Sequence, residues 1–315
     1  MDTVVDNSRT MIRKGSKSFS AAARLFDRST RESAYMLYAW CRHGDDVIDG
    51  QRLGFGADAA AAESADERLA SLYRATRSAL AGEPTDDPVF EAFQRVVERH
   101  RIPARYPLEL LEGFAMDVRG HRYDTLEDTL LYCYHVAGVV GVMMAYVMGA
   151  REQETLRRAS DMGIALQLTN ISRDVMEDAG VGRVYLPAQW LEQAGVPGDA
   201  IADPRYRGAV FSVVERLLDE ADRYYDSAFC GLPDLGFRCA WAIATARGVY
   251  RDIGSLVRRR GAAAWDARAV VSRPRKAYRA LLGIGQALAA VSVRRMLESP
   301  PREGLWTKPD PAPGS

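Results

Sequence analysis

Two short runs of acidic residues could hold a metal ion. Asp45 and Asp49 stand four residues apart in the first run. Asp174 and Asp178 have the same spacing in the second, one turn after Asn170. Residues four apart share a helix face, and like charges at that spacing weaken a helix unless a cation lies between them. The sequence therefore predicts two rows of oxygen ligands for a hard divalent cation such as Mg²⁺, which also binds substrate phosphates.

Other polar residues near the acidic runs suggest a phosphorylated substrate. Arg42 lies three residues before Asp45 and seven before Asp49, on the same face, and its guanidinium can bind phosphate oxygens with two parallel hydrogen bonds. Asp46 points about 100° away from that face and is not expected to bind the metal. A group ahead of the first long helix could bind further phosphate oxygens: Ser16, Lys17 and Ser18.

Helices must position these residues, and the composition favours an all-α fold. The chain has 315 residues, of which 47% are hydrophobic, so it can bury a large core. Ala, Leu, Arg and Glu recur at helical spacing, and Pro and Gly interrupt the pattern at most helix boundaries. We expect one helical domain over residues 1–298 and a disordered, proline-rich tail over 299–315. The main helices are expected over 29–50, 87–100, 107–119, 126–149, 154–178, 204–229, 233–260 and 273–298.

Charge and metal-binding residue types exclude several classes of protein. The formal net charge is zero, which argues against a nucleic-acid-binding protein. Residues 251–279 hold a local excess of Arg and Lys, which could bind an anion or lie on an ordinary solvated face. The four histidines show no zinc-binding spacing, and the four cysteines no C-x-x-C pair, as in a reduced cytoplasmic protein.

The sequence shows neither a signal peptide nor an obvious membrane span. The N-terminal stretch is polar and lacks an apolar core. The longest apolar run, 136–150, covers about fifteen residues, short of the roughly twenty that cross a bilayer. Its small residues Gly138, Gly141 and Ala145 suit a buried helix that packs closely against its neighbours or lines a cavity. We therefore expect a soluble or peripheral protein.

The second acidic run carries a resemblance to a known family. Its pattern N-x-x-R-D-x-x-x-D, at 170–178, is followed by G-R-V-Y-L-P at 182–187. This resembles the squalene/phytoene synthase family, the trans-isoprenyl diphosphate synthases that join two prenyl diphosphates head to head. Three further segments agree: G-S-K-S-F at 15–19, Y-A-W-C-R at 38–42 and Y-C-Y-H-V-A-G at 132–138. The resemblance covers nearly the whole chain up to the proline-rich tail.

The resemblance implies a helical bundle around a central cavity, with an aspartate-rich wall on each side of its mouth. It implies a prenyltransferase that joins two twenty-carbon geranylgeranyl diphosphates, through prephytoene diphosphate, to phytoene, the first step of carotenoid biosynthesis, and releases two diphosphates. Mg²⁺ or Mn²⁺ on Asp45, Asp49, Asn170, Asp174 and Asp178 would stabilise the leaving diphosphate. No NADPH is expected.

The same resemblance and the reaction's chemistry assign further residues. Arg268 falls where the family has an arginine that contacts phosphate, and we also assign Gln167, Arg183 and Tyr185 to substrate binding. Aromatic faces can stabilise a carbocation by about 1 kcal/mol or more in a dry site. Core packing is the alternative role for each aromatic candidate: Phe19, Tyr38, Tyr132 and Tyr250, of which Tyr132 and Tyr250 are assigned to catalysis.

Two other readings stay open. A squalene or dehydrosqualene synthase would use farnesyl diphosphate, and the squalene-forming members also use NADPH; the sequence has no dinucleotide fingerprint, which is weak evidence against them. A non-catalytic prenyl-lipid binding protein of the same fold would be expected to lose metal ligands, and all four aspartates are present here. A di-iron carboxylate bundle needs Glu-x-x-His motifs that the chain lacks.

The expected product also bears on location. A forty-carbon hydrocarbon cannot leave into water, because each exposed methylene costs on the order of 0.8 kcal/mol. We therefore expect a cytoplasmic protein with peripheral membrane association and a possible handover of product to a phytoene desaturase.

Overall fold

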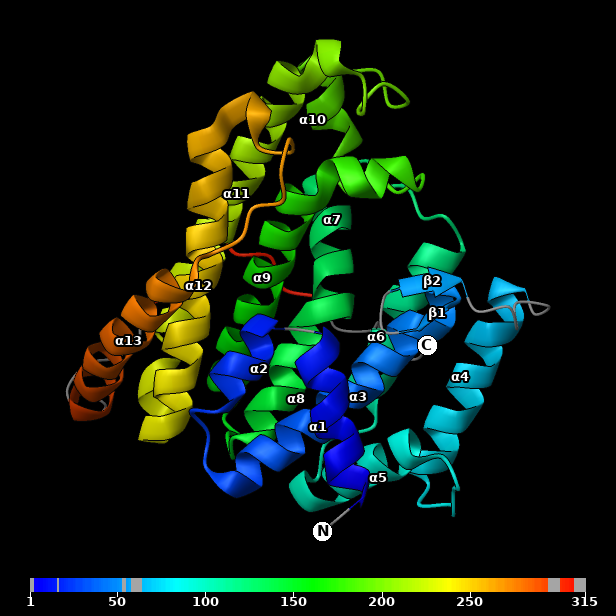
Figure 1. Cartoon of the computed structure of the whole chain (residues 1–315), viewed down its shortest axis with the longest axis vertical. Coiled ribbons are helices and arrows are strands. Elements are labelled where there is room, and N and C mark those ends of the chain that lie inside the picture. The colour runs from blue at the N-terminus through cyan, green and yellow to red at the C-terminus, as the bar shows by residue number, and fades with distance from the viewer. Residues whose placement is uncertain (1–2, 16, 53–54, 58–63, 294–300, 309–315) are drawn as a thin grey trace.

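The chain folds as a bundle of α-helices, which confirms the expected fold class (Figure 1). The computed structural model describes residues 3–15, 17–52, 55–57, 64–293 and 301–308. The strands β1 (Gln51–Arg52) and β2 (Phe55–Ala57) form a two-stranded antiparallel ribbon at the end of α3. No other strand occurs in these ranges.

The first half of the described chain holds the helices α1 to α7. They are α1 (Thr3–Gly15), α2 (Lys17–Ala23), α3 (Arg28–Asp49), α4 (Ala65–Leu80), α5 (Pro88–His100), α6 (Arg105–Val118) and α7 (Leu126–Cys133). The second half begins with a π-helical turn, Tyr134–Gly138, that joins α7 to α8 (Val139–Val147). The remaining helices are α9 (Gln153–Gly180), α10 (Ala188–Gln193), α11 (Arg207–Phe229), α12 (Phe237–Arg260) and α13 (Arg273–Val293).

Helix α9 runs through the middle of the bundle and carries the second acidic run (Figure 1). It packs against α8 with the π-turn, α11 and α12. The contact between α8 and α9 is made by backbone, because a Cβ added to Gly141 would lie 2.2 Å from the Ala159 carbonyl oxygen. A Cβ added to Gly163 would lie 2.1 Å from the Ala137 carbonyl oxygen. The expectation of close packing at Gly141 is therefore confirmed.

Helix α3 carries the first acidic run, and its ends are defined by local sequence. Asp27 caps the N-terminus by accepting a hydrogen bond from the Thr30 amide at 3.0 Å. Gly50 ends the helix in a left-handed conformation, φ 62°, which glycine adopts at little cost. The acidic run therefore occupies the last turns of α3, directly before the β1–β2 ribbon.

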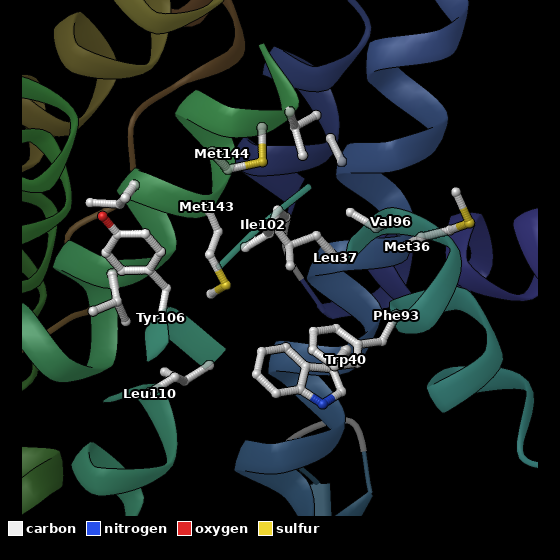
Figure 2. Packing of buried hydrophobic residues seen from close by; sticks show 14 of the residues in the cluster. Met36, Leu37, Trp40, Phe93, Val96, Ile102, Tyr106, Leu110, Met143 and Met144 are labelled. Carbon is white, nitrogen blue, oxygen red and sulfur yellow. The ribbon is translucent and has the colours of Figure 1, made fainter. Parts of the chain in front are cut away.

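A hydrophobic core anchors α3 against α5 and α6 (Figure 2). Trp40 stacks on Phe93 with ring centroids 4.1 Å apart, and both side chains are almost completely buried. Leu37 and Met143 lie in the same cluster. Burying an aromatic or Leu side chain contributes roughly 1.5–3 kcal/mol, so these contacts hold the acidic end of α3 in place.

One apolar stretch is longer in the structure than the sequence suggests. The π-turn joins α7 and α8 into a helical stretch, Leu126–Val147, that is long and apolar enough by composition to cross a membrane. However, 61% of its most apolar window is buried inside the protein, as expected of a core helix. The prediction that no apolar stretch is long enough to cross a membrane is therefore wrong for the length of this helix. Its burial in the protein core explains why its residues are apolar.

The expectation of disorder from Ser299 onward is wrong for residues 301–308, which pack on the bundle. Arg302 forms an ion pair with the fully buried Asp161, with Nη2 2.5 Å from Oδ1. Trp306 lies against Tyr134, and Lys308 binds Glu109 at 2.8 Å. An unpaired buried carboxylate would be costly, so Asp161 gives this segment a fixed position. Residues 299, 300 and 309–315 lie outside the described part of the chain.

The basic excess over residues 251–279 is largely neutralised. Arg258 pairs with Asp219 and Asp222 of α11, at 2.7 and 2.8 Å. Arg275 pairs with Asp252 at 2.8 Å. Arg258 therefore adds no unpaired charge to this surface, because its partners lie on a helix that the linear sequence does not place beside it. Arg275 shares Asp252 with Arg279, so one positive charge of that pair remains.

Candidate active site

A cavity of about 460 Å³ lies inside the bundle and is lined mainly by apolar side chains. Its walls come from α2, α3, the π-turn, α8, α9, α12 and α13. Met144 of α8 and Met148, directly after that helix, line the cavity together with Ile243 and Ala246 of α12. The cavity also reaches the turns of α3 and α9 that precede the two acidic runs, at Tyr38 and Asn170, and we call this end its mouth. Among the described residues, the acidic side chains themselves are not part of the lining.

In the first acidic run, Asp46 and Asp49 form close ion pairs with arginines, whereas the ion pair of Asp45 is longer. Arg42 donates to Asp46 at 2.8 Å and lies 3.6 Å from Asp45, while Asp49 pairs with Arg183 at 2.6 Å. The Asp45 side chain keeps 53% of its surface accessible, although the surrounding protein still removes part of its hydration. Burial, with Asp49 and Asp46 nearby, raises the pKa of Asp45 to about 7.

In the second acidic run, the close ion pairs are instead made by Asp174, the aspartate nearer to the cavity. Arg173 donates to both oxygens of Asp174, and Arg268 approaches Asp174 at 3.2 Å. Arg268 also pairs with Glu177 at 3.0 Å, although Glu177 stands four residues after Arg173 on the same helix. A loop residue distant in sequence thus takes the place of the helix neighbour.

Asp178 has no ion pair within the described residues. Its pKa is raised to about 7, first by burial and then by the negative charge of Asp174. Arg183, in the loop after α9, opposes this shift and also pairs with Asp49 of α3. Arg183 therefore links the two acidic walls, which are 134 residues apart at this contact.

A tyrosine cluster stands beside the mouth. The hydroxyls of Tyr132 and Tyr185 donate to the two oxygens of Asp117, at 3.0 and 2.9 Å, and their rings stack with centroids 4.6 Å apart. Burial raises the pKa of Asp117, and Arg183 opposes that shift. Tyr123 packs edge-on against Tyr132, a contact that the sequence analysis missed. Tyr132 and Tyr185 do not line the cavity in the described structure, and they hold Asp117 instead.

Two other predicted aromatic residues do line the cavity. Tyr38 of α3 and Tyr250 of α12 lie where the apolar walls give way to the acidic runs. Burial raises the pKa of Tyr38 to about 12, with smaller effects from Arg42 and Asp45. Gln167 and Asn170 of α9 also line the cavity, two turns and one turn before Asp174, respectively. These side chains form the boundary between a charged mouth and a dry interior.

Some predicted substrate-binding residues cannot be placed in full. Ser16 lies outside the described residues. Lys17, Ser18 and Phe19 belong to α2, but their side chains are not described. The same helix contributes Ala21 and Ala22 to the cavity wall, which places its backbone beside the site.

The donor set at the mouth suits a hard divalent cation. The pKa values of Asp45 and Asp178 are both raised by burial and by neighbouring carboxylates, so the mouth holds more negative charge than its arginines offset. All the donors are oxygen atoms, which Mg²⁺ prefers. Within the described ranges, no group of three or more His, Cys, Asp or Glu side chains is already gathered around one point. Water and substrate phosphates would complete such a shell.

An all-α bundle with an apolar cavity and two acidic walls defines the isoprenoid-synthase type of enzyme, and solved structures agree. The chain is similar to a dehydrosqualene synthase crystallised with a ligand, at 28% identity and a TM-score of 0.81, covering 91% of this chain and 97% of that one.

Sequence comparison identifies the family. The squalene/phytoene synthase family matches residues 12–275. The chain is 51% identical to a phytoene synthase of Pseudescherichia vulneris, over 97% of this chain and 98% of that protein. It is 52% identical to a 15-cis-phytoene synthase of Pantoea ananas, over 94% of each. The chain therefore belongs to the squalene/phytoene synthase family.

Proposed function

We propose that this protein joins two molecules of geranylgeranyl diphosphate head to head and forms phytoene. The observation that carries the proposal is the apolar cavity of about 460 Å³ whose mouth is walled by two acidic helices. Identity of about half to proteins named phytoene synthase, over nearly the whole chain, supports the same reaction. Prephytoene diphosphate is the expected intermediate, and two diphosphates are released.

The first chemical requirement is to stabilise the diphosphate that leaves. Asp45, Asp49, Asn170, Asp174 and Asp178 would hold Mg²⁺ or Mn²⁺, which supplies positive charge to the leaving group when bound. Arginines at the mouth can add hydrogen bonds to phosphate oxygens, because guanidinium groups bind phosphate bidentately. The candidates are Arg42, Arg183 and Arg268.

The second requirement is to protect the positive charge that forms on the prenyl chain. The cavity walls beyond the mouth are apolar, so water is excluded from the cation. Tyr38 and Tyr250 lie at the boundary between mouth and interior, where a ring face can stabilise a cation by about 1 kcal/mol or more. The charge separation of the reaction thus parallels the separation of charged and apolar residues along the site.

A product assay tests this proposal directly. The purified protein is incubated with geranylgeranyl diphosphate and Mg²⁺, and the extract is analysed by mass spectrometry. We expect a forty-carbon hydrocarbon, formed without NADPH. Parallel incubations use farnesyl diphosphate with and without NADPH. A thirty-carbon product formed at higher catalytic efficiency would favour the squalene or dehydrosqualene alternative, and no turnover of either substrate would favour a prenyl-lipid binding protein.

We further propose that the protein works in the cytoplasm at a membrane surface, from which a phytoene desaturase would receive the product. The support is chemical, because a forty-carbon hydrocarbon partitions into lipid rather than water. Fractionation of cells that express the full chain tests this: we expect the protein in the membrane fraction and its release by high salt or carbonate. Full recovery in the soluble fraction would contradict it.

A further inference from the structure

Helix α13 exposes an apolar face to solvent. In the described residues, five of the eight large apolar side chains that remain exposed lie on this helix. Tyr278, Leu281 and Leu282 expose 47%, 68% and 38% of their surface, and Leu288 and Val291 expose 54% and 42%. Helices on the surface of soluble proteins normally turn polar residues outward, so this face requires an explanation.

The exposed face is continuous over the length of the helix. Between residues 277 and 291, every exposed position is occupied by an apolar residue or glycine. Arg279 is the only charged residue in that interval, and it turns toward α12, where it pairs with Asp252 at 2.6 Å. The buried side of α13 also packs on α12, through Gly283 against Trp241. The packing of α13 on the bundle therefore leaves much of the surface of these leucines uncovered.

The same helix forms part of the cavity wall. Lys276, Ala277 and Ala280 line the cavity together with Ala21 and Ala22 of α2. Ala277 is both an exposed residue and a lining residue, so the apolar interior approaches the surface beside the apolar face. In Figure 1, α13 lies at the outer edge of the molecule next to α12.

We propose that α13 docks this enzyme on a lipid bilayer, with Tyr278, Leu281, Leu282, Leu288 and Val291 inserted among the acyl chains. The argument rests on the proposed function, because a long hydrocarbon product must pass from the cavity into lipid. The adjoining cavity wall favours a bilayer over a second copy of the chain as the partner, since lipid dissolves a long hydrocarbon product and a second copy of the same enzyme does not consume it. The area offered by one helix face suits an interfacial helix that lies in the plane of the membrane.

Charge at one end of α13 agrees with this orientation. Arg273 and Arg275 are exposed in its first turn, and Arg275 shares Asp252 with Arg279. Basic residues beside an apolar face bind the anionic headgroups of a membrane, each contributing about 1 kcal/mol close to the surface. The remaining exposed length of the helix is uncharged, as insertion into the acyl region requires.

Flotation of the full chain with vesicles tests the proposal. The vesicles contain equal parts of phosphatidylcholine and phosphatidylglycerol. The test variants are L281E/L288E, which adds charge to the face, and L281S/L288S, which removes apolar surface without adding charge. The control A70E/S71E adds the same charge at two exposed positions of α4, on the opposite side of the molecule in Figure 1.

We expect the partition coefficient to fall by on the order of tenfold or more in both α13 variants, because two leucine contacts with lipid are lost. The control should bind within about twofold of the wild type, because distant charges are screened at physiological salt. Circular dichroism melting curves should coincide, since the altered residues are exposed. Turnover of detergent-dispersed geranylgeranyl diphosphate should persist in all variants.

Three outcomes would overturn the docking surface: unchanged vesicle binding in L281E/L288E, equal loss in A70E/S71E, or a wild-type dimer that L281S/L288S converts to a monomer. The failure of the proposed function is a separate result. If the wild-type protein bound vesicles through α13 but did not turn over geranylgeranyl diphosphate, the proposed docking surface would be supported and the proposed reaction would be contradicted.

Discussion

The two acidic runs have the same spacing of aspartates, but arginines pair with the outer aspartate in one run and with the inner aspartate in the other. Both helices line the cavity first and then carry two aspartates toward the mouth. On α3 the outer acid, Asp49, pairs closely with Arg183 at 2.6 Å, and we call the inner acid, Asp45, open because its ion pair with Arg42 is long, at 3.6 Å. On α9 the inner acid, Asp174, is tied to Arg173 and Arg268, and the outer acid, Asp178, stays open. Equal spacing in the sequence therefore does not make equal sites.

The difference separates two roles that aspartates can have. An acid tied to arginine contributes to stability, since removing it leaves a cation without its partner. An open, desolvated acid costs stability and is retained for binding a cation. Substitution of Asp45 and of Asp174 should therefore affect turnover alike but shift the melting temperature in opposite directions.

The largest effect is expected for the open acids. Asp45→Asn and Asp178→Asn should each lower turnover at least a thousandfold, on the order of what one electrostatic contact to the leaving group supplies. At pH 8 with EDTA, each should raise the melting temperature by about 2 °C, because a desolvated charge is removed. Steady-state assays and calorimetry measure the two effects. A large loss of stability in either variant would contradict the assignment of that acid as open.

The tied acid should behave differently in the second measurement. Asp174→Asn should abolish turnover as well but lower the melting temperature by roughly 3 °C, because Arg173 and Arg268 lose a charged partner. Calorimetry of this variant beside Asp45→Asn gives the comparison directly. Equal melting temperatures for the two variants would mean that the ion pairs with Arg173 and Arg268 do not make Asp174 more stabilising than Asp45.

The link between the walls is expected to matter less. Arg183→Gln should lower turnover about a hundredfold and destabilise the protein, because Asp49 and Asp178 lose their shared cation. Added Mg²⁺ should raise the melting temperature of this variant more than that of the wild type, since the ion replaces part of the lost charge. Arg268→Gln is the matched control because, among the described residues, Arg268 pairs with acids of α9 only. If Mg²⁺ raised its melting temperature as much as that of Arg183→Gln, the proposed role of Arg183 in linking the two acidic helices would be disproved.

The smallest effect is expected for the acid that faces away. Asp46→Asn should lower turnover no more than about tenfold, because Asp46 holds Arg42 rather than the metal. It should lower the free energy of unfolding by about 1 to 2 kcal/mol through the weakened ion pair. Activity and denaturant curves for Asp46→Asn and Asp45→Asn, taken together, test this order. A greater loss of turnover at Asp46 would reverse the assignment of faces on α3.

Much of the site could be predicted because helical spacing and residue chemistry are local. Asp45 and Asp49, or Asn170 and Asp174, share faces whatever the rest of the fold does. The partners of these acids could not be predicted, since Arg183 and Arg268 reach them from loops. Glu177 shows the same limit, because Arg173 stands four residues before it on α9, yet the loop residue Arg268 is its ion-pair partner.

The fold shows the same limit. Most of the longer helices followed from apolar periodicity with Pro and Gly at the boundaries, whereas α1, α2 and α10 were not among the expected ranges. The packing of Arg302 on Asp161 did not, because a proline-rich segment resembles a disordered tail and its buried partner lies 141 residues earlier. The basic segment around Arg258 was misread in the same manner, since its acidic partners stand on α11.

The glycine contact between α8 and α9 limits how this enzyme can change its substrate. Gly141 and Gly163 leave no side chain between the two backbones, so the distance between these helices is already at its minimum. A larger residue there would separate the helices and disturb the acidic turns of α9 at the same time. A cavity for longer or shorter prenyl chains must therefore arise from residues elsewhere on its walls. Met144, Met148 and Ile243 are flexible or exchangeable side chains at such positions, and variation in chain length among relatives is expected to follow them.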